Sequence, residues 1–225
     1  MKNTLINLTL LFWVLTISFS GIGQTNEIKI KFIGNCGLYM TDGNLNIYSD
    51  FPYKSGAYGY MEFDDSALDS IKNNSVFIFT HKHADHYSGK NMRKVLKAKG
   101  GTKFGPWNVK KLEEFANKNP DFDIQTFKTK HKYSFNHYSY LITWHGKRIF
   151  LSGDTESAET IGELKDLDWA FIPYWILYDA NKKKIKIDTE KIGLYHLYPN
   201  QKMEGEVPEK MLVLKEQNVV ISLPY

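Results

Sequence analysis

The order of hydrophobic and polar residues along the chain predicts strands and helices in turn. Residues 27–33 alternate, with Ile28, Ile30 and Phe32 on one side, as in a half-buried strand. Residues 76–80 form a continuous apolar run, which is typical of a strand covered on both faces. Further strands are predicted at residues 38–40, 45–48, 124–129, 138–144, 148–152, 169–173, 184–187 and 219–223.

Helices are predicted where apolar residues recur three and four positions apart. Between about His86 and Lys99, the side chains of Met92, Val95 and Leu96 share one face, and two glycines follow. Further helices are expected at residues 109–117, 159–165 and 207–216. Strands grouped in this way between helices predict one α/β domain with mixed sheets.

The first 24 residues predict a targeting segment. Lys2 precedes an apolar run from Leu5 to Phe19, and small residues follow, as in a secretory signal peptide. The run is short for a membrane span, although an uncleaved anchor is the alternative, and no other stretch is apolar enough to cross a bilayer. We therefore expect an exported protein, periplasmic or secreted, in which residues 25–225 form a single domain with no stable membrane span.

Composition narrows the class of protein further. A chain of 225 residues with 42% hydrophobic and 24% charged residues suits one globular domain with its own core. The net charge of +4 is too small to indicate a nucleic-acid partner. A single cysteine excludes a disulfide framework and a zinc site built mainly from thiolates.

The strongest chemical signal is the segment Thr80-His-Lys-His-Ala-Asp-His86, directly after the apolar strand. In an extended backbone, His81 and His83 project to the same side, and Asp85 and His86 lie where the chain turns into a helix. Imidazole nitrogens and carboxylate oxygens suit Zn²⁺ at about 2.0–2.2 Å. Four such groups exceed what one open catalytic site takes from a single loop, which favours two metals roughly 3.5–4 Å apart.

This segment resembles the His-x-His-x-Asp-His motif of the metallo-β-lactamase superfamily. The resemblance extends over nearly all of the chain after residue 24, because further features occur in the expected order. These are the opening hairpin that ends at Asp50, His131 after a strand, the segment Gly153-Asp-Thr155 after another strand, and the late histidine His196. The resemblance implies a four-layer αββα sandwich, in which two mixed β-sheets are flanked by helices.

The resemblance also implies a ligand set. The first metal would be bound by His81, His83 and His131, the second by Asp85, His86 and His196, and Asp154 would bridge them; Asp85 and Asp154 are also the candidate catalytic residues. Asp50 is expected either to orient a ligating histidine or simply to cap a turn. The cofactors implied are two divalent ions, Zn²⁺ first, with Mn²⁺ or Fe²⁺ as alternatives because the same ligand types suit all three.

Some of these assignments compete with simpler ones. His137 competes with His131 as a ligand, but His131 lies 23 residues before Asp154 and leaves room for the intervening strand and turn, whereas His137 lies only 17 before it. His145, next to a turn glycine, is predicted to be exposed, and Cys36 is predicted to be a small packed residue. A simpler role for His196 is that of a histidine at the edge of the core, and for Asp154 that of a turn residue.

The surroundings of the site give weaker signals. Aromatic residues make up 15% of the chain, and several in predicted loops could wall a substrate pocket: Tyr53, Tyr58, Tyr60, Trp107, Tyr174, Trp175 and Tyr178. The run Lys182–Lys184 is predicted to be the exposed end of a strand, and an alternative role is to attract an anionic substrate.

The implied function is metal-dependent hydrolysis of a small molecule. A hydroxide bridging two metals would attack a carbonyl carbon, in a lactone or a thioester, or a phosphodiester. An aspartate at position 154 argues against the cysteine-dependent β-lactamases, and the compact Gly34-Asn-Cys-Gly37 opening is most similar to the branch of L-ascorbate-6-phosphate lactonase. The competing functions are an iron-dependent oxidoreductase of the same fold, similar to persulfide dioxygenase, and a non-catalytic metal-binding protein.

Overall fold

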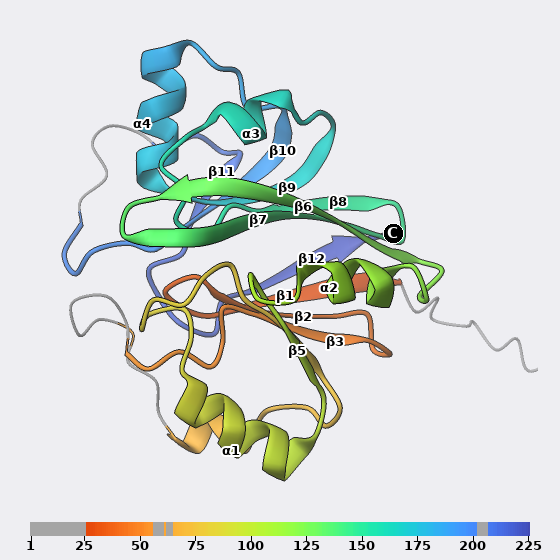
Figure 1. Cartoon of the computed structure of the whole chain (residues 1–225). Coiled ribbons are helices and arrows are strands. Elements are labelled where there is room, and N and C mark those ends of the chain that lie inside the picture. Colours follow the sequence, from red (N-terminus) through yellow and green to blue (C-terminus); the bar gives the residue numbers. More distant parts are fainter. Residues whose placement is uncertain (1–25, 56–60, 62–64, 202–206) are drawn as a thin grey trace, which may run out of the picture.

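The computed structural model describes residues 26–55, 61, 65–201 and 207–225 (Figure 1). The predicted signal peptide, residues 1–24, lies outside the described residues, as do Tyr58 and Tyr60. No helix within the described ranges has both the length and the hydropathy that a membrane span requires.

Two mixed sheets of six strands face each other (Figure 1). The first contains, in spatial order, β12 (Val220–Pro224), β1 (Glu27–Gly34), β2 (Gly37–Thr41), β3 (Asn46–Ser49), β4 (Val76–Ile78) and β5 (Thr102–Phe104). The second contains β11 (Met211–Val213), β10 (Thr189–Tyr195), β9 (Leu167–Pro173), β8 (Lys147–Leu151), β7 (Ser134–Trp144) and β6 (Phe122–His131). In the first sheet β3, β4 and β5 are parallel, and in the second β8 to β11 are parallel.

Helices cover the outer faces of both sheets, since each presents a short apolar stripe to them. Met92 and Val95 of α1 pack with Phe77 and Phe79 on the outside of the first sheet. On the outside of the second sheet lie α3 and α4, which pack against its outward-facing side chains. These helices are α1 (Gly89–Lys99), α3 (Glu159–Glu163) and α4 (Tyr174–Lys183). The predicted four-layer αββα sandwich is therefore confirmed.

The core between the sheets is large and apolar. Phe32 of the first sheet and Tyr140, Trp144 and Phe171 of the second are at most 1% exposed and belong to one cluster. The helix α2 (Val109–Ala116) also contributes to this cluster through Leu112 and Ala116, and it lies beside β6 rather than on an outer face. The remaining short helix is a 3₁₀ turn over Asp65–Leu68.

Because this core is large and is built almost wholly from apolar side chains of both sheets, we expect the protein to fold without metal. After treatment with a chelator, denaturant should still unfold the chain in one cooperative transition. Adding metal at 100 times its Kd should raise the stability by about 2.7 kcal/mol. Circular dichroism during a urea titration measures both, and a chelated protein without a cooperative transition would contradict this expectation.

The chain between residues 174 and 187 differs from the prediction. A strand was expected at 184–187, but the chain forms α4 first, Lys182 and Lys183 occupy its last turn, and the strand β10 begins only at Thr189. Ile176 and Ala180, four residues apart, anchor the helix on the second sheet. Ile185 and Ile187 pack against the same cluster, so their apolar pattern reflects packing without strand pairing.

Two further predictions are wrong. Residues 207–216 do not form a helix, because Met211–Val213 pairs in parallel with β10 and Leu214 enters the central core. His145 is not exposed: its side chain is 19% accessible, its Nε2 lies 2.8 Å from Asp42 Oδ2, and its ring stacks on Tyr225 at 3.9 Å. The histidine thus joins the turns at one end of the two sheets.

Candidate metal centre

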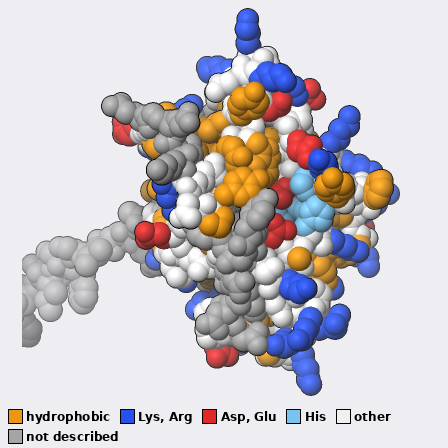
Figure 2. All heavy atoms as spheres, turned by 90° about the vertical axis from the view of Figure 1, so that its left-hand side faces the viewer, with side chains coloured by type: hydrophobic (Ala, Val, Ile, Leu, Met, Phe, Trp, Pro, Cys, Tyr) orange, Lys and Arg blue, Asp and Glu red, His pale blue; other side chains and the backbone are white. Residues whose placement is uncertain are grey.

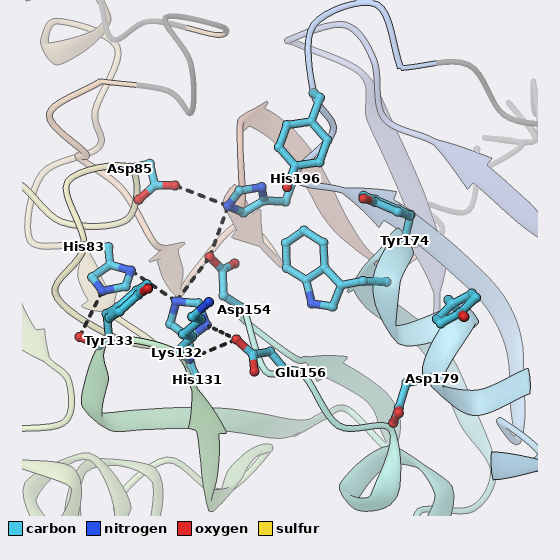
Figure 3. A pocket seen from close by; sticks show the side chains of 13 residues that line it. His83, Asp85, His131, Lys132, Tyr133, Asp154, Glu156, Tyr174, Asp179 and His196 are labelled. Atoms are coloured by element: carbon cyan, nitrogen blue, oxygen red, sulfur yellow. Dashed lines mark hydrogen bonds and ion pairs between the residues drawn. The ribbon is translucent and has the colours of Figure 1, made fainter. Parts of the chain in front are cut away.

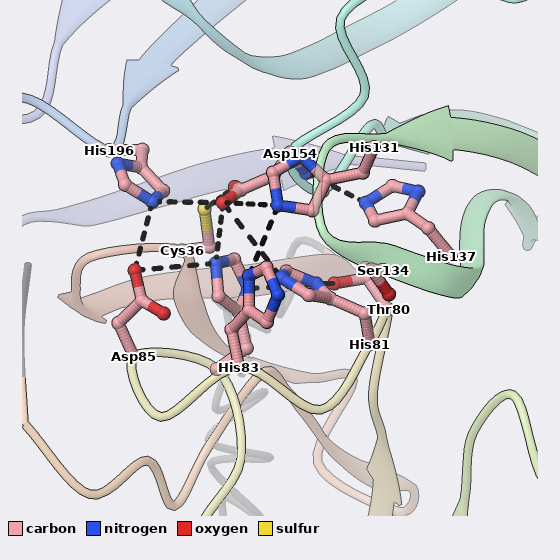
Figure 4. Close-up of polar contacts among 12 residues, drawn as sticks. Cys36, Thr80, His81, His83, Asp85, His131, Ser134, His137, Asp154 and His196 are labelled. Atoms are coloured by element: carbon pink, nitrogen blue, oxygen red, sulfur yellow. Dashed lines mark hydrogen bonds and ion pairs between the residues drawn. The ribbon is translucent and has the colours of Figure 1, made fainter.

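The predicted ligands come together at one edge of the sandwich, at strand ends from both sheets. The loop between β4 and α1 contains His81, His83, Asp85 and His86. The helix begins only after its N-cap, Ser88, so the whole motif lies outside it. His131 is the last residue of β6. Asp154 follows β8, and His196 follows β10. Figure 4 shows the side chains of His83, Asp85, His131, Asp154 and His196 pointing toward one another from separate elements.

Asp154 lies at the centre of the group. Its Oδ2 atom is 3.0 Å from His86 Nε2 and 3.1 Å from His196 Nε2. The same oxygen is 4.0 Å from His81 Nε2 and 3.9 Å from His131 Nε2. One carboxylate oxygen therefore faces imidazoles of both predicted metal sites.

The first set of donors is His81, His83 and His131, one atom of each lying within 4.8 Å of the others. His83 Nδ1 is 3.1 Å from His131 Nε2, although 48 residues separate them in sequence. The side chain of His81 is fully buried, whereas that of His131 is 14% accessible. This set therefore opens toward solvent on one side.

The second set contains His86, His196 and Asp154, and the structure adds Cys36 to it within the same 4.8 Å limit. Cys36 is buried as predicted, but its thiol also contacts the cluster, since Sγ donates to Asp154 Oδ1 at 3.6 Å. Asp85 Oδ2 lies 3.2 Å from His196 Nε2 and 3.9 Å from His86 Nε2. Asp85 thus stands at the outer side of the second set.

Several buried ring nitrogens in these sets have no well-directed hydrogen bond among the described residues, although His86 Nε2 and His196 Nε2 lie close to the carboxylates named above. These nitrogens are His81 Nε2, His86 Nε2, His131 Nδ1, and both ring nitrogens of His196. Buried polar atoms are nearly always satisfied, so a concentration of unsatisfied nitrogens requires an explanation. Neutral imidazole nitrogens converging with carboxylates are the donor set that Zn²⁺ and similar divalent ions use. The residues present therefore fit the metals that the sequence implies.

Asp50 lies directly behind His86. Its Oδ2 atom is 2.9 Å from His86 Nδ1, so His86 turns Nε2 toward Asp154. The carboxylate also accepts from the backbone N–H and the hydroxyl of Thr80, at 2.7 and 2.8 Å. Of the two interpretations of Asp50, the structure supports orientation of the histidine, because three donors hold this carboxylate in place.

Replacing Asp50 with asparagine should weaken the second metal selectively. The loss of the carboxylate partner of His86 should lower that affinity by roughly 10–100-fold. The first metal should be retained, because the hydrogen bonds of Asp50 go to Thr80 and His86, and His81 is linked to it only through the Thr80 hydroxyl. Metal content after dialysis against a graded chelator measures this, and equal loss of both metals would contradict it.

His137 occupies a different position from His131. It is fully buried, its Nδ1 lies 2.7 Å from Thr129 Oγ1, and its Nε2 accepts from the backbone N–H of Asp154 at 2.9 Å. Burial lowers the pKa of His137 to about 3, so the ring stays neutral. Both of its nitrogens have partners, and the geometry therefore favours His131 as the donor to the cluster.

The electrostatics of the two sets differ. Burial lowers the pKa of His81 and of His131, so both rings are neutral at pH 7. Burial acts in the same direction on His86 and His196, but the neighbouring carboxylates together outweigh it. Asp154 and Asp50 raise the pKa of His86 well above its usual value, and Asp154 and Asp85 raise that of His196 to about 9. In turn, these two histidines hold the pKa of Asp154 well below its usual value despite burial.

A cavity of about 790 Å³ opens over this cluster (Figures 2 and 3). Figure 2 shows a continuous area of hydrophobic side chains beside the histidines on this face. Tyr174, Trp175 and Tyr178 line the cavity, as the sequence suggested, but they do so from α4 rather than from a loop. Tyr53 does not line it, because its ring is buried under the first sheet and its hydroxyl donates to the Met61 carbonyl.

Sequence reasoning missed other residues of the cavity wall. Lys132 and Tyr133 form the tip of the β6–β7 hairpin, Glu156 follows the Asp154 turn, and Tyr198 lies two residues after His196. Each lies within two residues of a predicted ligand. That proximity is the signal that could have identified them.

The fold is shared with solved metallohydrolase structures. The chain matches no family model, and no curated protein matches its sequence. Igni18, a metallo hydrolase of Ignicoccus hospitalis, superposes with a TM-score of 0.62 at 16% identity, over 88% of this chain and 99% of that chain. A proposed metal-dependent hydrolase of Parabacteroides distasonis superposes with a TM-score of 0.59 at 21% identity, over 78% of this chain and 84% of that chain. Isothiocyanate hydrolase from gut bacteria of Delia radicum superposes with a TM-score of 0.57 at 12% identity, over 88% of this chain and 100% of that chain.

These likenesses, at low identity, establish the architecture. The structure combines two mixed six-stranded sheets with outer helices and a histidine-rich loop after β4. The chain has the metallo-β-lactamase fold. In this metallo-β-lactamase fold the cluster lies where strand ends of both sheets meet, so residues from all parts of the sequence reach one point.

Proposed function

We propose that the protein is an exported, metal-dependent hydrolase that cleaves a carbonyl ester, lactone or thioester of a small molecule. The observation that carries the proposal is the position of Asp154 Oδ2 between two sets of histidines at the base of an open cavity. Two divalent ions bound there, zinc in the first instance, would polarise a carbonyl and lower the pKa of a water molecule to about 7. Export rests on the sequence of residues 1–24.

The chain's own residues have separable roles in this proposal. His81, His83 and His131 bind the first ion, and Asp85, His86 and His196 bind the second. Asp154 would be shared by both ions, because its Oδ2 faces imidazoles of both sets. Burial raises the pKa of Asp85, but His196 and His86 together lower it to about 2, so its carboxylate is ionised where it lines the cavity. In hydrolysis, water adds to the carbonyl carbon, the bond to the leaving group breaks, and that group takes up a proton.

The cavity wall favours a carbonyl centre over a phosphodiester. Tyr174, Trp175 and Tyr178 offer aromatic surface, and Glu156 and Asp179 add negative charge at the outer wall. Lys132 is the only lysine or arginine lining this cavity among the described residues. A largely apolar substrate body with an uncharged scissile group suits this wall better than a nucleotide-like polyanion. Because isothiocyanate hydrolase has a similar fold, we also include an isothiocyanate among the substrates to test; its central carbon is the electrophile.

The test is turnover by zinc-loaded protein of a 4-nitrophenyl ester, a δ-lactone, a thioester, phenethyl isothiocyanate and bis(4-nitrophenyl) phosphate. We expect turnover of at least one of the carbonyl compounds, and His83→Ala should lower it by roughly 10³-fold or more. His145→Gln is the matched control, since it removes a histidine that lies outside the cluster and contacts Asp42.

Metal analysis distinguishes the competing functions. About two zinc ions per chain, with activity, supports the hydrolase. A single iron ion with oxygen-dependent activity would support the oxidoreductase instead. A fully loaded protein that turns over none of the carbonyl compounds, even if it cleaves the phosphodiester, or turnover that survives His83→Ala, would contradict the proposal.

A further inference from the structure

A second, smaller groove lies on the other side of the β6–β7 hairpin from the main cavity. Its volume is about 270 Å³, and His83 and Tyr133 line both spaces. The hairpin tip, where the Tyr133 carbonyl lies 3.4 Å from His83 Nε2, therefore separates two compartments that meet at a predicted metal ligand. The smaller one falls below the range of about 300–1,000 Å³ typical of whole small-molecule sites, so it suits one substituent of a substrate.

The groove carries positive charge, in contrast to the main cavity. Lys82 lines it, and none of its lining residues is acidic: the others are His83, Pro106, Trp107, Tyr133, Ser134, Phe135 and Asn136. The main cavity is lined by four carboxylates, those of Asp85, Asp154, Glu156 and Asp179. A substrate that spans both would meet aromatic and acidic groups on one side of His83 and a cation on the other.

Lys82 has this position because of its place in the sequence. It stands between His81 and His83, and in an extended segment its side chain projects to the side opposite theirs. Its ammonium group lies 5.2 Å from the centre of the Trp107 ring. The same ring has a second cation, Lys103 Nζ, at 5.8 Å from its centre.

The charge of Lys82 is not neutralised within the described part of the chain, where it makes no ion pair with a carboxylate. A cation over an aromatic ring at an exposed site gains only about 0.5–1 kcal/mol. An anionic oxygen in the groove offers a stronger partner, since hydrogen bonds to charged groups contribute about 1.5–3 kcal/mol. The ammonium group can therefore leave the indole for a bound anion.

We propose that this groove is an anion subsite, in which Lys82 binds a carboxylate at one end of the substrate while the apolar body occupies the main cavity. The subsite rests on the proposed hydrolase function and refines it: the preferred substrate is an amphipathic ester or lactone with one carboxylate. Trp107 provides the apolar floor along which the methylene groups next to the carboxylate pack.

The test compares two esters of equal chain length in zinc-loaded protein, mono-4-nitrophenyl adipate, which ends in a carboxylate, and 4-nitrophenyl hexanoate, which does not. Lys82→Gln should lower kcat/KM for the adipate ester by roughly tenfold or more and leave the hexanoate ester within about twofold. Lys110→Gln is the control, because it removes an equal charge from an exposed site on α2, and it should change neither value. Lys132→Gln tests the cation of the main cavity.

Equal effects of Lys82→Gln on the two esters, or loss of the preference in Lys132→Gln instead, would overturn the subsite. If the wild-type protein cleaves neither ester, the hydrolase proposal fails for esters, and calorimetric binding of the matching amides decides the subsite separately. Adipic acid monoanilide should then bind about tenfold more tightly to the wild type than to Lys82→Gln, with no such difference for hexananilide. Equal binding of the monoanilide to both proteins would refute the assignment.

Discussion

Replacing Asp154 with alanine should remove both metals together and abolish turnover. Oδ2 of this residue lies within 4.0 Å of imidazole nitrogens from both sets, so its loss takes a shared negative charge from each. Without it, two cations at roughly 3.5–4 Å separation would repel each other with no anion between them. Activity should fall by about 10³-fold or more, as expected when one member of a catalytic unit is removed.

Metal content after gel filtration is the deciding measurement for Asp154→Ala. Asp179→Asn is a suitable control, because Asp179 also lines the cavity but contacts Lys183 and the Ala158 amide rather than the cluster. The control should keep both metals. Loss of only one metal from Asp154→Ala would show that this carboxylate is not shared, and retention of both would remove it from the ligand set.

Local sequence patterns predicted those parts of the site whose geometry depends on neighbouring residues. The His81–His86 segment follows a buried strand, and this fixes the directions of its side chains regardless of what packs elsewhere. The spacing to Asp154 led us to prefer His131 over His137, and in the structure two strands, β7 and β8, separate His131 from Asp154, whereas His137 lies within β7. The resemblance to a known family supplied the distant partners, Asp154 and His196, which no local pattern identifies as ligands.

The elements that were missed depend on tertiary contacts. The α4 sequence is rich in aromatic residues and its helical pattern is weak, so its helix depends on Ile176 and Ala180 packing on the second sheet. Met211–Val213 becomes a strand because β10 has an open edge to pair with. Cys36 was missed because only the folded chain brings its thiol to Asp154. Alternation places the Lys82 side chain opposite those of His81 and His83, but only the folded chain shows that Trp107 and the groove lie on that side.

The two metals should bind with different pH dependence. Imidazoles must be neutral to bind a metal, and the raised pKa values of His86 and His196 mean that both carry protons near pH 7 in metal-free protein. The pKa values of His81 and His131 are lowered, so these rings bind without losing a proton. Acidification therefore weakens the second site more steeply, by up to about 100-fold per pH unit when two protons are displaced.

The protons released at each site can be measured by calorimetry. Zinc is titrated into chelated, dialysed protein between pH 7 and pH 8.5, in buffers of different ionisation enthalpy. We expect at most about one proton for the first equivalent, from a metal-bound water, and up to two more for the second, from His86 and His196, so one metal per chain is retained at the lower pH and two at the higher. Asp50→Asn provides a check, since it removes a carboxylate 2.9 Å from His86 Nδ1 that contributes to the raised pKa. Its second site should release fewer protons. Identical proton release for both equivalents would show that the charges on His86 and His196 do not differ from those on His81 and His131.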